Sequence, residues 1–250
     1  MLEVLHVSKT FNRGTINEKK ALIDVSLSLD AGEFVTVIGG NGAGKSTLLN
    51  AVAGAWPIDD GAIILDGVNI SGVPEHKRAP LIGRVFQDPM IGTAPNMTLQ
   101  ENLALAYRRG KRRTLRWGIT PKEKDLYRER LSTLNLGLEN RMSTNVGLLS
   151  GGQRQAVTLL MAALQQPKLL LLDEHTAALD PKTAEKVLIF SDQIVKEFHL
   201  TTMMITHNMT DAIEHEDRLI MMAEGEIVFD IRGEDKTSLK REELIAKYKI

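Results

Sequence analysis

The stretch from Gly39 to Thr47 constrains the fold of this chain more than any other part of its sequence. It reads Gly-Gly-Asn-Gly-Ala-Gly-Lys-Ser-Thr and matches the pattern G-x-x-x-x-G-K-[ST] at every fixed position. The apolar run at residues 34–38 predicts a buried strand before it, and residues 46–53 predict a helix after it that stops at Gly54. A phosphate-binding loop needs this strand-loop-helix setting, so the sequence predicts a nucleotide site in an α/β fold.

Glycines in such a loop let the backbone curl, so that successive N–H groups point at a polyphosphate above a helix N-terminus. Lys45 is expected to reach the β- and γ-phosphates, and the Ser46 hydroxyl is expected to coordinate Mg²⁺. The alternative is a glycine-rich turn without a ligand, which the complete motif in its setting disfavours. The predicted nucleotide-binding residues of the loop are Gly39, Gly40, Asn41, Gly42, Ala43, Gly44, Lys45, Ser46 and Thr47.

Composition narrows the function classes. With 250 residues, 43% of them hydrophobic, the chain can form one large domain or a domain with a subdomain. Its net charge of -1 gives no overall drive toward nucleic acid, and the absence of cysteine excludes disulfides and thiolate chemistry. We expect neither a signal peptide, because residues 1–6 contain a charge, nor a spanning helix, because no apolar stretch approaches roughly 20 residues.

The first half of the chain predicts strands followed by helices. Residues 2–7 and 21–29 are expected to form strands, with a turn at 8–14 between them, and residues 62–65 are expected to form a strand of a small antiparallel layer beside the main sheet. Residues 82–86 predict a strand that ends at Gln87. Helices are expected from Thr98 to Tyr107 and over 121–136, which together predict a helical subdomain. Between them, residues 108–116 carry six cations, which indicates either a solvated loop or a contact with phosphate, lipid or nucleic acid.

The second half of the chain places acidic and polar residues at strand ends. Ser150 is expected to cap a helix that runs to about Gln165. The apolar run 169–172 predicts a central parallel strand that ends on Asp173 and Glu174. A helix over 182–198, a strand over 202–206, a hairpin over 219–230 and a terminal helix over 238–250 follow. Since open α/β sheets bind ligands at the carboxyl ends of their strands, these acids belong to the predicted site.

These residues predict phosphoryl chemistry. Asp173 is expected to hold the metal ion together with Ser46, and Glu174 is expected to accept the proton of an attacking water. Gln87 and His207, each at the end of a strand, are expected to contact that water, the metal ion and the γ-phosphate. Taken singly, either one is equally consistent with an ordinary surface residue.

The segment Leu149-Ser150-Gly151-Gly152-Gln153 resembles the signature sequence of ABC-type ATPases. Given that resemblance, Gln87 corresponds to the Q-loop glutamine, Asp180 to the D-loop and His207 to the switch histidine. Phe11 corresponds to the aromatic residue that stacks on adenine, although a core position is equally consistent with it. The resemblance implies that Ser150 and the residues up to Gln153 close over ATP held by a second subunit. It also implies ATP and Mg²⁺ as cofactors.

The resemblance covers the whole chain and implies an α/β P-loop NTPase core with a mixed, mainly parallel sheet, an antiparallel β layer and an inserted α-helical subdomain. Within a single ABC ATPase domain, 1–250, it implies a RecA-like core with the β layer at 1–87 and 167–235. The helical subdomain is expected at 88–166 and a C-terminal helix at 236–250. His175 stands where the family usually has proline, which predicts altered packing and retained activity.

The function implied is that of the ATP-hydrolysing subunit of an ABC membrane transporter, most similar to bacterial importers of small solutes such as amino acids. Implied partners are a second ATPase subunit in a homodimer, transmembrane permease subunits and an extracytoplasmic solute-binding protein, with no nucleic acid. The implied location is the cytoplasmic face of the cell membrane. The alternative is a soluble ABC ATPase that drives assembly of a non-membrane complex, such as iron–sulfur cluster assembly.

A run of apolar and small residues follows Gln87 and is long for an exposed loop. We expect it either to line a groove that receives a short helix of the permease or to pack the subdomain onto the sheet. Its members are Met90, Ile91, Ala94, Pro95, Met97 and Leu99.

Overall fold

A computed structural model describes residues 1–111, 118–208, 212 and 218–233, and its contacts divide the chain into two compact units. The first unit comprises Met1–Arg78, Leu171–Glu174 and Leu200–Ile250, and the second comprises Ala79–Leu170 and His175–His199. The boundaries expected for the helical subdomain, 88–166, and for the core stay a prediction. The helix predicted over 236–250 lies outside the described residues.

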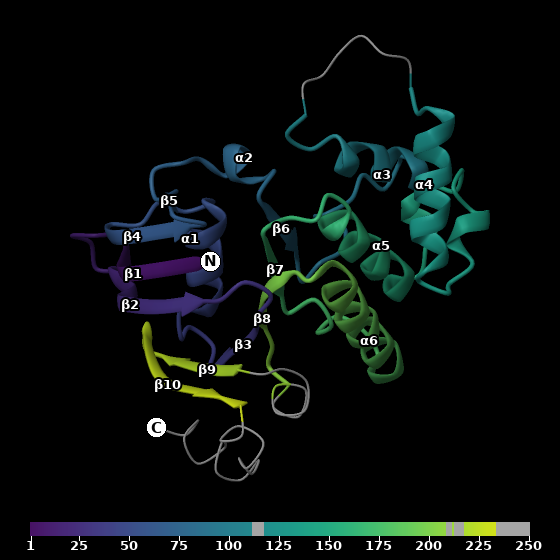
Figure 1. Ribbon diagram of the computed structural model, residues 1–250. Helices are drawn as coiled ribbons and strands as arrows, with labels where there is room; N and C mark the ends of the chain where they lie inside the picture. Colours follow the sequence, from purple (N-terminus) through teal and green to yellow (C-terminus); the bar gives the residue numbers. More distant parts are fainter. Residues whose placement is uncertain (112–117, 209–211, 213–217, 234–250) are drawn as a thin grey trace. The chain divides into compact units, whose positions relative to one another are not determined.

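An antiparallel sheet forms one part of the first unit (Figure 1). It contains β1 (Leu2–Phe11), β2 (Lys19–Leu29), β4 (Asp60–Leu65) and β5 (Val68–Asn69) in the order β2-β1-β4-β5. The predicted antiparallel layer is therefore present, but the predicted turn at 8–14 begins too early. Strand β1 continues through Phe11, because pairing with β2 down to the register Phe11↔Lys19 satisfies the backbone of these polar residues.

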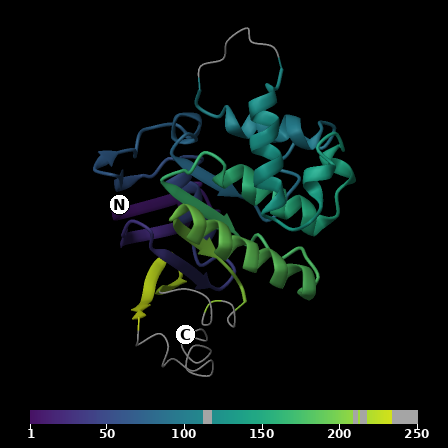
Figure 2. The same cartoon turned by 45° about the vertical axis from the view of Figure 1, so that its right-hand side comes forward.

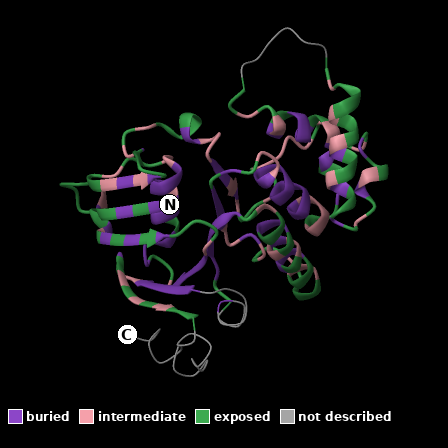
Figure 3. Cartoon of the chain, in the orientation of Figure 1, coloured by how far each residue is buried: buried purple, intermediate pink, exposed green. Residues whose placement is uncertain are grey.

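The main sheet of the first unit is built around β3 (Phe34–Gly39), which is buried along its whole length (Figure 3). Strand β3 pairs in parallel with β8 (Thr201–Ile205) on one side and with β9 (Arg218–Ala223) on the other. The sheet continues to β7 (Leu169–Asp173) beyond β8, and to the antiparallel β10 (Glu226–Arg232) beyond β9. A central parallel strand is covered on both faces, which explains its continuous apolar sequence.

Two buried arginines hold the parts of the first unit together. Arg218, which is 2% exposed, donates to both carboxylate oxygens of Asp230 at 2.7 and 2.6 Å and to the Ser28 carbonyl at 2.5 Å. Arg78, at the end of α2 (Glu75–Arg78), donates to the carbonyls of Ala51 and Val52 at 2.9 and 2.8 Å. Those carbonyls belong to the last turn of α1 (Lys45–Ala53), so Arg78 satisfies that end of the helix.

The second unit contains β6 (Ile82–Val85), α3 (Leu99–Tyr107), α4 (Pro121–Ser132), α5 (Gly151–Ala163) and α6 (Pro181–Phe198), with short 3₁₀ turns at Leu138–Asn140 and Val146–Leu148 (Figure 2). Capping boxes begin three of its helices: Thr98 with Glu101, Thr120 with Glu123 and Ser150 with Gln153. Helix α4 ends four residues earlier than predicted. Asn135 and Gly137 both have positive φ angles, which a continuing helix does not allow.

Helix α5 forms the centre of the second unit, and nine of its residues, from Gln155 to Ala163, are buried. Tyr127 and Leu131 of α4 are fully buried, as are Leu99 and Leu103 of α3. Of the two alternatives for Leu99, a groove or internal packing, the structure supports packing, because α4 and α5 pack against α3. Among the described residues, no helix is both long and apolar enough to cross a bilayer.

Three of the six cations at residues 108–116 have partners inside the second unit. Arg108 donates to both carboxylate oxygens of Glu123 at 3.0 Å, and Arg109 donates to the Ala162 carbonyl at 3.0 Å. The Lys111 ammonium lies 3.6 Å from the centroid of the Tyr107 ring. These contacts explain three of the six cations, whereas residues 112–117 lie outside the description.

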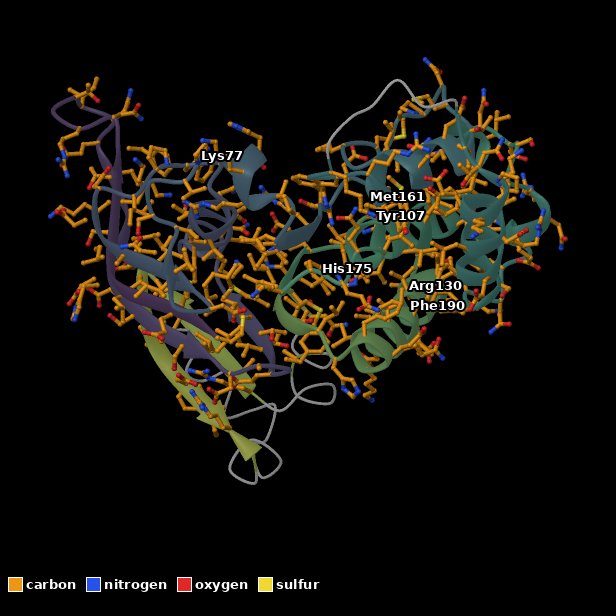
Figure 4. The ribbon with its side chains drawn as sticks, turned by 45° about the horizontal axis from the view of Figure 1, so that its top comes forward. Lys77, Tyr107, Arg130, Met161, His175 and Phe190 are labelled. Carbon is orange, nitrogen blue, oxygen red and sulfur yellow. The ribbon has the colours of Figure 1, made fainter. Side chains whose placement is uncertain are left out.

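His175, labelled in Figure 4, is a buried residue between β7 and α6. Its Nε2 lies 2.8 Å from the Ser191 hydroxyl, which donates to the Val187 carbonyl at 2.9 Å. Burial disfavours the imidazolium form and lowers the pKa of His175 to about 4. The imidazole is therefore neutral in the folded protein at neutral pH.

This low pKa predicts that acid destabilises the protein through His175. The unfolded chain, with a pKa near 6.5, binds a proton that the folded chain does not, so stability falls as the pH falls below 6.5. We expect this residue to account for a loss of about 2 kcal/mol between pH 7 and pH 5. Denaturant titrations at both pH values should show a smaller loss for His175→Gln than for the unmodified protein. An equal loss in both proteins contradicts the assignment.

Candidate nucleotide site

A cavity of about 220 Å³ in the first unit contains most of the predicted nucleotide-binding residues. Strands β1 and β2, the loop before α1, the first turn of α1 and the ends of β7 and β8 contribute to its walls. The lining residues are Phe11, Lys19, Ala21, Asn41, Gly42, Ala43, Gly44, Lys45, Ser46, Thr47, Glu174 and His207.

The backbone of the loop is held in its curled shape by packing against its neighbours. Gly44 precedes α1 with a φ of 103°, and a Cβ atom there would lie 2.5 Å from the Ala21 carbonyl oxygen. Only glycine fits this position. The Ala43 carbonyl accepts a hydrogen bond of 3.0 Å from the Gly225 N–H, which fixes the loop against the hairpin turn between β9 and β10. No side chain caps α1, so the N–H groups of its first turn are available to an anion.

Lys45 supplies a buried positive charge to this loop. Lys45 is 5% exposed, and its Nζ donates to the carbonyls of Gly39 and Gly40 at 2.7 and 3.1 Å. Burial lowers the pKa of Lys45, while the negative charges of Glu174 and Asp173 act to raise it. Gly39 and Gly40 thus differ from the rest of the loop, because their carbonyls bind the lysine and they do not line the cavity.

Glu174 and His207 meet at the ends of neighbouring strands. The Glu174 carboxylate oxygen lies 2.5 Å from His207 Nε2, and the Glu174 N–H donates to the Ile205 carbonyl of β8 at 3.0 Å. Glu174 has a φ of 45°, which residues other than glycine seldom adopt. The backbone bond to Ile205 and the side-chain contact with His207 hold Glu174 in this conformation, and Glu174 lines the cavity.

Phe11 also lines the cavity. Its ring packs edge-on against Trp56, with centroids 5.0 Å apart, and is half-buried. The ring packs against a neighbour and also lines the cavity, and its stacking on adenine stays a prediction.

Most of the remaining predicted site residues belong to the second unit, and none of these lines this cavity. Gln87 follows β6. Ser150 is the N-cap of α5, where Gly151, Gly152 and Gln153 form the first turn, and Asp180 is the N-cap of α6. Asp173, in the first unit, is the last residue of β7. The roles of these second-unit residues in binding the nucleotide therefore stay predictions.

Sequence reasoning missed two lining residues, Lys19 and Ala21 of β2. The sequence predicts Phe11 in the site, but no motif marks the facing strand. The register Phe11↔Lys19 identifies Lys19, because it places this residue opposite the predicted base-stacking ring.

Oxygen donors near the phosphate loop suit a magnesium ion. Mg²⁺ keeps several waters and uses one or two protein ligands together with substrate phosphates. The Ser46 hydroxyl lines the cavity, and the Asp173 carboxylate is near enough to Lys45 to affect its pKa. Within the described part of the chain there is no group of three or more His, Cys, Asp or Glu side chains that could hold a metal ion. Ser46 and Asp173 are the residues that fit a magnesium ion bound together with phosphate.

Comparison with known proteins places this geometry in a family. Residues 22–177 match the ABC transporter family. The tyrosine transport ATP-binding protein of Clostridioides difficile (strain R20291) is 43% identical over 248 residues, covering 99% of this chain and 98% of that protein. The phosphonates import ATP-binding protein PhnC 2 of Oceanobacillus iheyensis is 35% identical over 237 residues, covering 92% of this chain and 89% of that protein.

Solved structures agree with this assignment. A dimeric, post-hydrolysis structure of an ATP-binding cassette bound to ADP and Pi superposes with a TM-score of 0.79 at 29% identity, covering 93% of this chain and 98% of that one. The phosphate loop and these matches define an ATP-hydrolysing cassette. The chain belongs to the ABC transporter family and is an ATPase that binds ATP. The predicted P-loop NTPase fold is confirmed.

Proposed function

We propose that this chain is the ATP-hydrolysing subunit of an ABC importer for a small solute, with amino acids as the first substrate class to test. The observation that supports the hydrolytic role best is the meeting of Lys45, Glu174 and His207 with the glycine loop in one cavity. The import role is supported by relatives whose names specify tyrosine transport and phosphonate import. These relatives favour transport over the assembly of a non-membrane complex.

Each site residue of the first unit has its own task in the proposed reaction. The loop N–H groups and Lys45 bind the phosphates and offset their charge. Glu174 accepts a proton from the water that attacks the γ-phosphorus, and ADP leaves with the bridging oxygen. His207, 2.5 Å from Glu174, holds the carboxylate in place. Bound Mg²⁺, held by Ser46 and Asp173 with Gln87 as a further proposed ligand, would neutralise charge on the phosphates.

The signature residues of the second unit are proposed to serve the nucleotide of a second subunit. Ser150 and Gly151 are exposed at the N-terminus of the thirteen-residue helix α5, where N–H groups and a hydroxyl suit a γ-phosphate. The dimeric cassette among the similar structures supports two copies per assembly. Asp180, exposed at the start of α6, is proposed to act near the same interface.

An exposed apolar patch, formed by Met90, Ile91 and Leu148, is proposed to contact the permease. Ile91 is 65% exposed and Leu148 is 74% exposed. Arg154 joins the two segments, because its guanidinium lies 2.7 Å from Met90 Sδ and donates to the Gly147 carbonyl at 3.0 Å. Such a contact would hold the chain at the cytoplasmic face of the membrane. A solute-binding protein outside the membrane is the further partner proposed for an importer.

The proposed general base is tested by Glu174→Gln, which removes the proton acceptor and nearly keeps the shape. ATP hydrolysis should fall on the order of 10² to 10⁴-fold, while ATP binding remains. Cells with this variant as their only copy of the protein should lose uptake of one radiolabelled substrate in a panel that contains tyrosine, other amino acids and a phosphonate. Glu185→Gln, at an exposed position of α6, is the matched control. Normal hydrolysis contradicts the base assignment, and unchanged uptake with no membrane association favours the non-membrane alternative.

The shared site is tested by mixing two inactive variants. Lys45→Ala spoils the phosphate loop and Ser150→Arg spoils the signature, so each homodimer has two defective sites. A mixed dimer contains both lesions in one site and an intact second site, so part of the ATPase activity should return. Ser150→Arg also removes a helix cap, so its melting temperature is measured first. A mixture as inactive as its components refutes the shared site.

The apolar patch is tested by three charge substitutions in the second unit. Ile91→Asp should abolish co-purification with the permease and keep the melting temperature and ATP binding, because Ile91 is exposed. Ile189→Asp, at an exposed position of α6, should change neither property. Leu99→Asp should unfold the subunit, because it buries an unpaired charge. Normal permease binding by Ile91→Asp shows that the permease contacts another surface.

A further inference from the structure

Lys19 is a charged residue of the cavity that neither the family motifs nor the reaction above uses. It is the first residue of β2 and pairs directly with Phe11 of β1. Residues directly opposite each other in an antiparallel pair have their side chains on the same face. Lys19 and Phe11 accordingly both line the nucleotide cavity. The adjacent Lys20 pairs with Thr10, and this second pair lies on the opposite face, outside the lining.

The Lys19 ammonium reaches the phosphate loop itself. A Cβ atom built on Gly42 would lie 3.1 Å from Lys19 Nζ, with no other heavy atom within 4 Å. Gly42 has a φ of 82° and lies in the middle of the loop, three residues before Lys45. Lys19 therefore approaches the loop from the cavity side, whereas Lys45 Nζ contacts the carbonyls of Gly39 and Gly40.

The position of Lys19 between Phe11 and Gly42 indicates which part of a nucleotide it meets. With a base on Phe11 and the β- and γ-phosphates on the loop, the segment between them contains the ribose and the first phosphates. An ammonium prefers the phosphate oxygens, because they carry the charge. Contact with the base itself is less consistent with the structure, since the ammonium over the Phe11 ring belongs to Lys9, at 5.5 Å.

We propose that Lys19 binds the phosphate chain of the nucleotide as a second lysine, from the strand opposite the base-stacking residue. The inference rests on the proposed nucleotide site and deepens it. Lys45 is buried beside Glu174 and Asp173, whose charges partly offset its own. Lys19 adds a positive charge at the exposed side of the loop, so it contributes to binding of ATP and ADP alike and does not select the base.

The test compares Lys19→Met with the matched control Lys20→Met. Both remove one exposed charge from neighbouring positions of β2, and only the first lies in the cavity. Calorimetric titration should show ATP, ADP and GTP binding to Lys19→Met about five- to tenfold more weakly than to the unmodified protein. Lys20→Met should stay within about twofold, Lys19→Arg should recover most of the affinity, and all variants should melt alike. The affinity of Lys19→Met should also depend less steeply on salt.

Three results overturn the proposal. The first is an affinity of Lys19→Met within twofold of the unmodified protein. The second is an equal loss for Lys19→Met and Lys20→Met, which indicates a general effect of surface charge. The third is a change in the ratio of ATP to GTP affinity, which indicates contact with the base. Failure of the nucleotide site itself is recognised separately, because Lys45→Ala would then bind ATP as well as the unmodified protein does.

Discussion

The hydrogen bond between the Gly225 N–H and the Ala43 carbonyl is the contact on which the nucleotide cavity depends. The Gly225 carbonyl in turn accepts from the Ile23 N–H at 2.9 Å, so one hairpin turn joins the phosphate loop to β2. The loop backbone is curled and its positive φ angles are costly for most residues, so external contacts must hold it. The antiparallel layer is therefore part of the site. It contributes Phe11 and Lys19 to the lining and also fixes the loop that the lining surrounds.

Three buried cations in the first unit show how the same charge serves structure or function. The guanidinium of Arg78 donates to four backbone carbonyls, and that of Arg218 binds a carboxylate through two bonds. Both satisfy their fixed partners, and breaking such a buried pair leaves an uncompensated charge. Lys45 instead donates to two carbonyls of a glycine loop and has carboxylates nearby. Its single ammonium on a flexible stem can exchange a carbonyl for a phosphate oxygen, which a fixed guanidinium cannot do as readily.

The local parts of this fold could be predicted from the sequence. The strand-loop-helix around Lys45 and the capping box from Thr98 to Glu101 depend on residues that are close together in the chain. What could not be predicted depends on distant partners. Strand β1 extends to Phe11 because β2 pairs with it, and Lys19 enters the cavity because of that register. Leu99 is buried because the other helices pack against the face of α3 on which it lies. The sequence spacing of residues 90–99 does not predict which face those helices cover.

The chain passes from one compact unit to the other at the proposed general base. Glu174 is the last residue of its segment in the first unit, and His175 is the first residue of the next segment in the second. The bonds to Ile205 and His207 hold Glu174 in the first unit, while the hydrogen bond to Ser191 holds His175 against α6 in the second. The side chains of two adjacent residues are thus held by different elements, Glu174 by His207 after β8 and His175 by Ser191 of α6, so each unit anchors its own side of the peptide that joins them.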